Sequence, residues 1–139
     1  MSLCQVDDSG LLFISPVIRD WAPIRERGIE AVIDLEGELD HDVPTIPDGM
    51  LYLYYPIYDE ELPDLVRLDA VVTLGATLVS ARRKVLSHCG MGFNRSALVA
   101  GLILNRTGVP GVEVVRSLRR CRPGALFNDR FAEYLRSLP

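Results

Sequence analysis

The sequence predicts a single α/β domain built on a central, mostly parallel sheet of about four or five strands flanked by helices. Three observations support this fold class. Short apolar runs alternate along the chain with longer segments whose apolar residues recur at helical spacing. One of these runs, 31–35, is apolar almost throughout, as expected of a strand that is buried on both faces of a parallel sheet. The length of 139 residues also suits one domain, which would span residues 1–139.

The first half of the chain is predicted to contain several strands and one short helix. Short apolar runs bounded by turn residues are expected to form strands at 11–14, 31–35 and 50–55. A helix is expected over 20–27, where Asp20 is the candidate N-cap and Gly28 ends the helix. The segment 36–49 is predicted to be a loop, because glycines and prolines interrupt it and acidic residues dominate its first part.

The second half continues the alternation. An acidic loop, 56–63, leads into the longest predicted helix, 64–83, which carries one apolar face. A further strand is expected at 84–86. More helices follow: one is expected from Ser96, one from Pro110, and a last one with Asn128 or Asp129 as its cap.

The segment from His88 to Ser96 connects the last strand to the following helix, and it is suited to hold a tetrahedral oxyanion. The first amides of a helix have no acceptor within it, and the helix dipole adds positive charge at that end. Glycines allow neighbouring amides to curl around an anion, and an arginine fork can bind two phosphate oxygens. The predicted phosphate-binding loop consists of Gly90, Met91, Gly92, Phe93, Asn94 and Arg95. Oxyanions such as phosphate, sulfate and vanadate are its expected ligands.

Cys89 opens this loop and is the candidate nucleophile. The pKa of a free cysteine is about 8.5, and helix N-termini with cationic neighbours lower it to roughly 3.5–7.5. Ser96 is placed to donate a hydrogen bond to the sulfur, and it is also a candidate N-cap of the helix. The alternative is a buried structural cysteine at the end of a strand, followed by a glycine turn.

The run His88-Cys89-x-x-Gly92-x-x-Arg95-Ser96 resembles the active-site motif of cysteine-based phosphatases, most closely the compact dual-specificity and tyrosine phosphatases. The resemblance follows the order of elements over most of the chain, but only the Cys89 loop is specific. It implies hydrolysis of phosphate esters through a phosphocysteine intermediate, with His88 supporting the loop. It implies no cofactor and no metal. The expected substrate is a protein carrying phosphotyrosine, phosphoserine or phosphothreonine, or a small phosphate ester.

A general acid is expected on the loop after the strand at 50–55, because the carboxyl ends of parallel strands meet at one sheet edge. The run from Tyr55 to Asp59 resembles the acid-bearing loop of these phosphatases, which implies Asp59 as acid and then as base. Neighbouring acids that remain alternatives are Glu60, Glu61 and Asp64. Asn128 resembles the asparagine of a Pro-Asn segment that braces the active site in this family, although phenylalanine replaces the proline here.

The composition and the cysteine spacing bear on the partners and the cellular compartment of the protein. A net charge of −4 gives no general attraction for nucleic acid or acidic lipid, so neither is an expected partner. The widely spaced cysteines indicate no disulfide framework and favour a reducing, cytoplasmic compartment. Neither a signal peptide nor a membrane span is expected. The acidic residues around His41 are interpreted as a solvated loop rather than as a metal site.

Two other functions stay open. The Gly92–Arg95 run also resembles RNA 5′-triphosphatases, so one alternative is an RNA 5′-tri- or diphosphatase, or another phosphatase of non-protein phosphate esters. The other alternative is a phospho-binding module without turnover. Such a module would normally have lost the cysteine, the arginine or the acid, and this chain keeps all of them.

Overall fold

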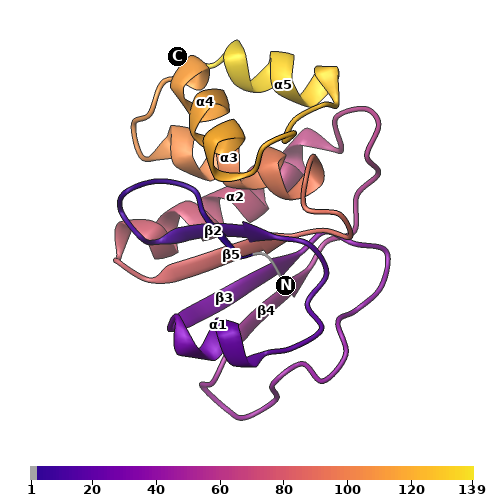
Figure 1. Cartoon of the computed structure of the whole chain (residues 1–139), viewed down its shortest axis with the longest axis vertical. Helices are drawn as coiled ribbons and strands as arrows, with labels where there is room; N and C mark the ends of the chain where they lie inside the picture. The colour runs from indigo at the N-terminus through magenta and orange to yellow at the C-terminus, as the bar shows by residue number, and fades with distance from the viewer. Residues whose placement is uncertain (1–2) are drawn as a thin grey trace.

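The computed structural model describes residues 3–139, which form a five-stranded sheet with helices on both faces (Figure 1). The strand order is β1-β2-β5-β3-β4. The strands are β1 Cys4–Gln5, β2 Leu12–Ser15, β3 Ile29–Asp34, β4 Leu51–Tyr54 and β5 Lys84–His88. Neighbouring strands run parallel, except that β1 pairs antiparallel with β2. The predicted mostly parallel α/β fold is therefore confirmed.

The prediction did not include β1, because a strand of two residues is too short to show an alternating pattern. The helices are α1 Ala22–Glu26, α2 Leu65–Ser80, α3 Arg95–Arg106, α4 Gly111–Cys121 and α5 Asp129–Arg136. Each of them falls within a segment that was predicted to be helical, with ends that differ by a few residues. Within residues 3–139, no helix has the length and apolarity needed to cross a membrane.

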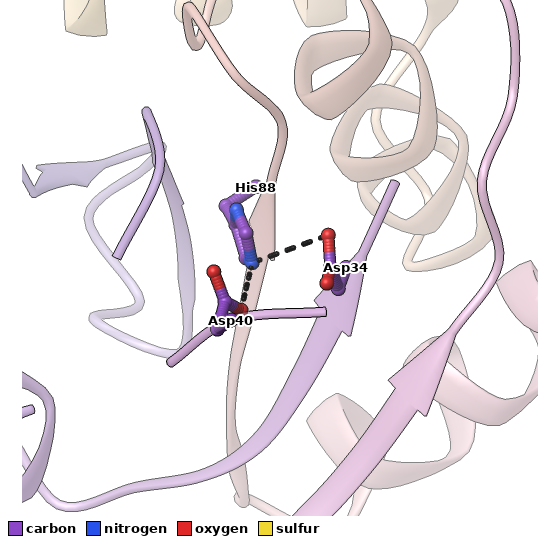
Figure 2. A group of neighbouring side chains, drawn as sticks. All are labelled: Asp34, Asp40 and His88. Atoms are coloured by element: carbon purple, nitrogen blue, oxygen red, sulfur yellow. Dashed lines mark hydrogen bonds and ion pairs between the residues drawn. The ribbon is translucent and has the colours of Figure 1, made fainter. Parts of the chain in front are cut away.

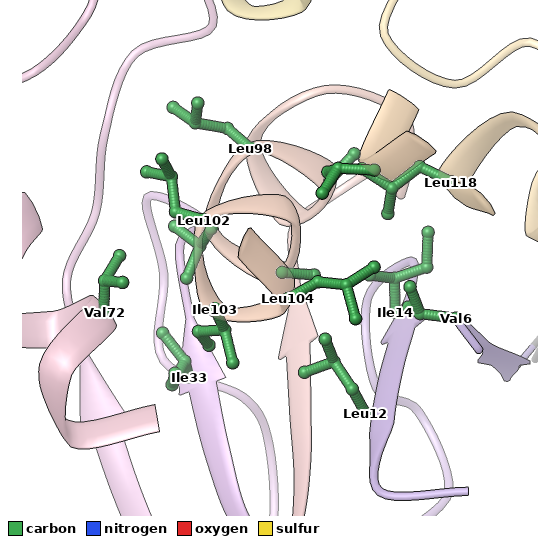
Figure 3. Close-up of a cluster of buried hydrophobic side chains, with 14 of the residues drawn as sticks. Val6, Leu12, Ile14, Ile33, Val72, Leu98, Leu102, Ile103, Leu104 and Leu118 are labelled. Atoms are coloured by element: carbon green, nitrogen blue, oxygen red, sulfur yellow. The ribbon is translucent and has the colours of Figure 1, made fainter. Parts of the chain in front are cut away.

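The helices cover the two faces of the sheet unequally. α1 lies on one face, where Ile24 and Trp21 pack with Phe13, Val32 and Leu86 from the sheet. The other four helices lie on the opposite face (Figure 1). That face carries the larger hydrophobic cluster, part of which Figure 3 shows around α3. Residues 96–104 of α3 are all buried, which explains why this segment is apolar on every side rather than on one stripe.

The ends of three parallel strands position the functional loops. Asp34, the last residue of β3, pairs in register with His88 at the end of β5 and with Tyr54 at the end of β4. The loops after these strands therefore leave the sheet at the same edge. In open α/β sheets this carboxyl edge is where ligands bind.

Candidate active site

The loop between β5 and α3 depends on Gly92. Its φ is +76°, in the left-handed region that residues with a Cβ rarely adopt. A Cβ at this position would lie 2.8 Å from the backbone nitrogen of Pro16 and 3.0 Å from the carbonyl carbon of Ser15. Gly92 therefore lets the loop turn back against the end of β2.

The sulfur of Cys89 lies at the base of this loop, and the residue is only 2% exposed. The backbone N–H of Gly92 donates to Sγ at 3.3 Å, and Oγ of Ser96 lies 3.4 Å from Sγ. A backbone N–H and a hydroxyl can both donate to a thiolate and stabilise it. Ser96 is not the N-cap of α3, which was the other role considered for it. It lies inside the first turn, and the N-cap position is occupied by Asn94, whose side chain makes no capping hydrogen bond.

Arg95 begins α3, and its guanidinium is held by the loops after β3 and β4. Nη2 donates to Oε2 of Glu36 at 3.1 Å, and Nη1 donates to the carbonyl oxygens of Ile57 at 3.4 Å and Leu35 at 3.5 Å. Nε of Arg95 is buried and has no hydrogen-bond partner within residues 3–139. The guanidinium therefore keeps a donor free for an anion while its other donors fix its position.

Glu36 is a site residue that the sequence did not identify. Its pKa lies below the ordinary value, chiefly because the N–H of Gly37 donates to it at 2.8 Å, and Arg95 adds to this effect. A Cβ at Gly90 would overlap Oε2 of Glu36, so the glycine leaves room for that carboxylate beside the loop. The only signal in the sequence was its place directly after a strand end, among several other acids.

Asp59 is joined to the phosphate-binding loop by two asparagines. Nδ2 of Asn94 donates to Oδ2 of Asp59 at 2.8 Å, and Nδ2 of Asn128 donates to Oδ1 at 2.8 Å. The backbone N–H of Asn128 donates to Oδ1 of Asn94 at 3.0 Å, which closes the arrangement. Asn128 also caps α5 by accepting from Arg130 and Phe131, which decides between the two candidate caps, Asn128 and Asp129.

The rival acids make other contacts. Asp64 caps α2 by accepting from the N–H groups of Val66 and Arg67, and these hydrogen bonds hold its pKa below the ordinary value. Glu61 forms an ion pair with Arg130 at 2.8 Å. Glu60 contributes its backbone carbonyl to Asn128. Asp59 is the acid of this loop whose carboxylate contacts the phosphate-binding loop itself.

His88 belongs to a buried polar network that lies behind the loop (Figure 2). Its Nε2 lies 2.6 Å from Oδ2 of Asp40 and 3.5 Å from Oδ1 of Asp34, so this nitrogen faces two carboxyl groups. The hydroxyl of Tyr52 contacts Asp34 and lies 2.9 Å from Oδ2 of Asp40. Burial raises the pKa of Asp34 despite these hydrogen bonds. The side-chain contacts of His88 go to Asp40 and Asp34 rather than to the loop, so its expected role in supporting the loop stays a prediction.

The network corrects one interpretation of the acidic loop after β3. Asp40 is buried against His88 and is not solvated. His41 and Asp42 are exposed, as expected. Asp34, Asp40 and His88 also present ligand atoms within 4.8 Å of one another, a donor set that metal ions accept. The Tyr52 hydroxyl also contacts both carboxyl groups of this set.

Exposed apolar side chains lie on and near the phosphate-binding loop. Met91 is 68% exposed, Phe127 is 67% exposed and Tyr58 is 81% exposed. Phe127 packs on Phe93 with a centroid separation of 5.9 Å. On the opposite side, Arg122 lies 4.2 Å from the Phe93 ring and donates to the carbonyl of Met91 at 2.9 Å. The loop is thus supported from α4 and from the α4–α5 connection.

Comparisons with known proteins agree with this geometry. A family model described as a DSP-PTPase phosphatase of polymorphic toxin systems matches residues 11–109. Dual specificity protein phosphatase 12 of Rattus norvegicus is 30% identical over 110 residues, which cover 78% of this chain and 32% of that protein. The chain therefore spans about a third of the length of this relative.

Solved structures are similar over almost the whole chain. Tk-PTP in its active form has a TM-score of 0.75 and 26% sequence identity, and the match covers 99% of this chain and 95% of that one. Human DUSP28 has a TM-score of 0.81 at 23% identity, covering 97% of this chain and 90% of that one. The second similarity is one of fold.

Proposed function

The chain belongs to the DSP-PTPase phosphatase family, and from this premise we propose that it hydrolyses phosphate monoesters through a phosphocysteine intermediate on Cys89. The observation that carries the proposal is the buried sulfur of Cys89, which accepts from the N–H of Gly92, lies 3.4 Å from the hydroxyl of Ser96 and belongs to a loop that ends at Arg95. The unpartnered Nε of Arg95 supports the proposal, because a phosphate oxygen would give this buried donor its acceptor.

The first step transfers the phosphoryl group. The loop amides and Arg95 bind the phosphate oxygens, and the Cys89 thiolate attacks phosphorus as the ester oxygen leaves. Asp59 in its protonated form gives its proton to that oxygen. The products of this step are phosphocysteine, the free alcohol or phenol, and an ionised Asp59.

The second step releases phosphate. The oxygen of a water molecule attacks the phosphorus of the phosphocysteine, and ionised Asp59 takes a proton from that water. The sulfur leaves as a thiolate, and Ser96 donates a hydrogen bond to it, which the separation of 3.4 Å permits. Asp59 gives up a proton in the first step and takes one in the second, and Cys89 gains the phosphoryl group and then loses it. Both residues therefore return to their starting states. The chemistry needs no metal ion or cofactor.

The proposed substrates are proteins carrying phosphotyrosine, phosphoserine or phosphothreonine. The exposed Tyr58, Met91 and Phe127 support this choice, because apolar side chains near the loop suit contact with a side chain or the peptide chain of a protein substrate. The rat relative is named a dual specificity protein phosphatase, which also favours protein substrates over RNA. The free cysteines suit a reducing compartment, and we propose a cytoplasmic location on that basis.

Turnover of p-nitrophenyl phosphate by wild type and by Cys89→Ser tests the proposed activity. We expect Cys89→Ser to lose activity by a factor on the order of 10³ or more, because the nucleophile is removed. Cys4→Ser, which removes a thiol outside the loop, is the matched control. Acid quenching during turnover should trap a phosphate on Cys89 that mass spectrometry can locate. A wild-type protein that binds vanadate but never forms this adduct would support a binding module instead.

A panel of substrates tests the proposed preference. Phosphotyrosine, phosphothreonine, phosphoinositide and 5′-triphosphorylated RNA substrates are compared by kcat/KM under the same conditions. We expect the phosphotyrosine substrate, the phosphothreonine substrate or both to give the highest kcat/KM. A preference for the RNA would overturn the assignment to protein substrates while leaving the phosphocysteine chemistry intact.

A further inference from the structure

Cys4 lies on the face of the sheet that the helices α2–α5 cover. It is paired in register with Ile14 of β2, and directly paired residues of antiparallel strands project from the same face. Ile14 belongs to the larger hydrophobic cluster, which also contains residues of all four helices. Cys4 is half-buried and packs against that cluster. Its thiol is therefore directed toward the helical layer.

Cys121 is the last residue of α4 and reaches the same part of the structure. Leu118, one turn earlier, belongs to the same cluster as Ile14 and Val6 (Figure 3). Cys121 is also half-buried against this cluster, and the neighbouring thiol of Cys4 contributes to the raised pKa of Cys121. The fold thus brings two free thiols together from nearly opposite ends of the chain.

This pair is distinct from the proposed nucleophile. Cys89 is almost fully buried, and its sulfur contacts Gly92 and Ser96. Cys4 and Cys121 both pack against the larger hydrophobic cluster and have no part in the proposed hydrolysis.

We propose that Cys4 and Cys121 are an oxidation site at which the two thiols form a reversible intramolecular disulfide. With hydrogen peroxide as the oxidant, the thiolate of one cysteine attacks a peroxide oxygen, and the O–O bond breaks. This gives a sulfenic acid and a hydroxide, which takes up a proton to become water. The second sulfur then attacks the sulfenic sulfur and loses its proton. The S–S bond forms, the S–OH bond breaks, and the hydroxide leaves with that proton as a second water. Two thiols lose two electrons in total, and one peroxide is reduced.

The order of the two steps follows from the environment of Cys121. Burial first, and then the charge and hydrogen bond of Cys4, raise the pKa of Cys121 to about 12. Because the thiolate is the reactive form, we assign the first step to Cys4. An uncharged sulfenic acid at Cys4 no longer opposes ionisation of Cys121, which favours the second step.

The disulfide would connect the edge strand β1 to the end of α4. Arg122 follows Cys121 and contacts both Met91 and Phe93 of the phosphate-binding loop.

A bond between residues so distant in sequence restricts the unfolded chain strongly. We therefore expect the oxidised protein to be more stable against thermal unfolding.

Thiol counting in the full-length Cys89→Ser variant tests the proposal, because Cys4 and Cys121 are then the only cysteines. Dilute protein is treated with hydrogen peroxide. We expect both thiols to disappear together in a monomeric product whose mass is lower by two hydrogen atoms, and dithiothreitol to restore them. Tm should rise by at least about 5 °C on oxidation and return on reduction.

Matched controls are Cys4→Ser and Cys121→Ser, each in the Cys89→Ser background. Neither should form a monomeric disulfide or gain Tm. The proposal is overturned if both thiols persist, if each is oxidised singly to a sulfinic acid, or if disulfides form only between chains. Because the readouts are thiol number, mass and Tm, failure here would leave the proposed hydrolysis untouched, and failure of hydrolysis would leave this result untouched.

Discussion

Asp59 accepts one amide hydrogen bond on each carboxylate oxygen, from Asn94 and from Asn128. The orientation of both amides is determined by backbone donors. Oδ1 of Asn94 accepts from the N–H of Asn128, and Oδ1 of Asn128 accepts from the N–H groups of Arg130 and Phe131. The amide nitrogens must then face Asp59. At the residue scale, the candidate acid is thus fixed relative to the loop that would bind the phosphate.

Asp59→Asn tests the role of this carboxylate. An alkoxide leaving group would lack its proton donor, so we expect kcat for an alkyl phosphate to fall by about 10²-fold or more. The loss with p-nitrophenyl phosphate should be much smaller, because nitrophenolate leaves without protonation. Steady-state kinetics with both substrates measures the difference, and Glu60→Gln is the matched control. Equal losses with the two substrates would argue that Asp59 positions the loop and does not transfer a proton.

Glu36→Ala tests how the guanidinium of Arg95 is positioned. The substitution removes the acceptor of Nη2, and small displacements of a substrate-binding group can cost up to about 10²-fold. We expect kcat/KM to fall between about tenfold and that limit, with a smaller loss for Glu36→Gln, which keeps an oxygen for Gly37. Glu38→Ala, at an exposed position of the same loop, is the control. Wild-type kinetics for Glu36→Ala would show that Ile57 and Leu35 suffice to hold Arg95.

At the scale of elements, the connection from β5 to α3 combines a left-handed glycine with a close approach to the end of β2. The strand–loop–helix order is evident in the sequence, but the contact with Ser15 and Pro16 depends on β2 lying next to β5. The same loop is contacted by Arg122 beyond α4 and by Asn128 before α5. Its shape is therefore maintained by several elements together.

Gly92→Ala tests the contribution of the contact. The new Cβ would meet both backbone strain and the atoms of Pro16 and Ser15. Gly28→Ala is a suitable comparison, because Gly28 has a φ of +74° and open space at the position of a Cβ. We expect Gly28→Ala to lose about 1–2 kcal/mol of unfolding free energy and to keep its activity. Gly92→Ala should lose more stability and also its binding of vanadate. Chemical denaturation and vanadate inhibition measure the two effects.

At the scale of the whole molecule, loops after three strands and a helix N-terminus meet at one edge of the sheet. Beneath them, Asp34, Asp40, Tyr52 and His88 bring ionisable groups into the interior. Burial also raises the pKa of Tyr52 well above its usual value, so its hydroxyl keeps its proton. A buried network of this kind affects global stability as well as the site.

The raised pKa of Asp34 predicts a dependence of stability on pH. A carboxyl group whose pKa is higher in the folded state than in the unfolded state stabilises the fold most when it is protonated. That stabilisation is present below the unfolded value, which is about 4, and is lost as pH rises through the folded value. We expect the unfolding free energy of Asp34→Asn, relative to wild type, to increase as pH rises from acidic to neutral.

Urea denaturation over a series of pH values measures this difference. Glu26→Gln, at an exposed carboxyl group, should show no comparable trend. A difference between Asp34→Asn and wild type that stays constant with pH would contradict the assignment of a raised pKa to Asp34.

Local patterns predicted the larger elements and the Cys89 loop. The apolar run at 31–35 identified β3, and residues 96–104 identified most of α3, because burial of a strand or helix requires apolar side chains over its own length. The Cys89 loop was recognisable because its residues are contiguous. Ser96 was considered as a possible N-cap of α3, but the structure has Asn94 at that position. The local sequence defines the ends of a helix poorly.

The roles of Glu36, Asp34, Asp40, Tyr52 and Asn94 were set only by the tertiary structure. Each acts through a partner far away in the chain, such as Glu36 on Arg95 or Tyr52 on Asp34. A lone acid or tyrosine carries no periodic signal that would distinguish a network member from a solvated side chain. The sequence by itself determined the α/β class and the strand–loop–helix that carries Cys89, because both depend on neighbouring residues. Which acids reach that loop follows only from the fold, because those contacts depend on the order in which the strands lie in the sheet.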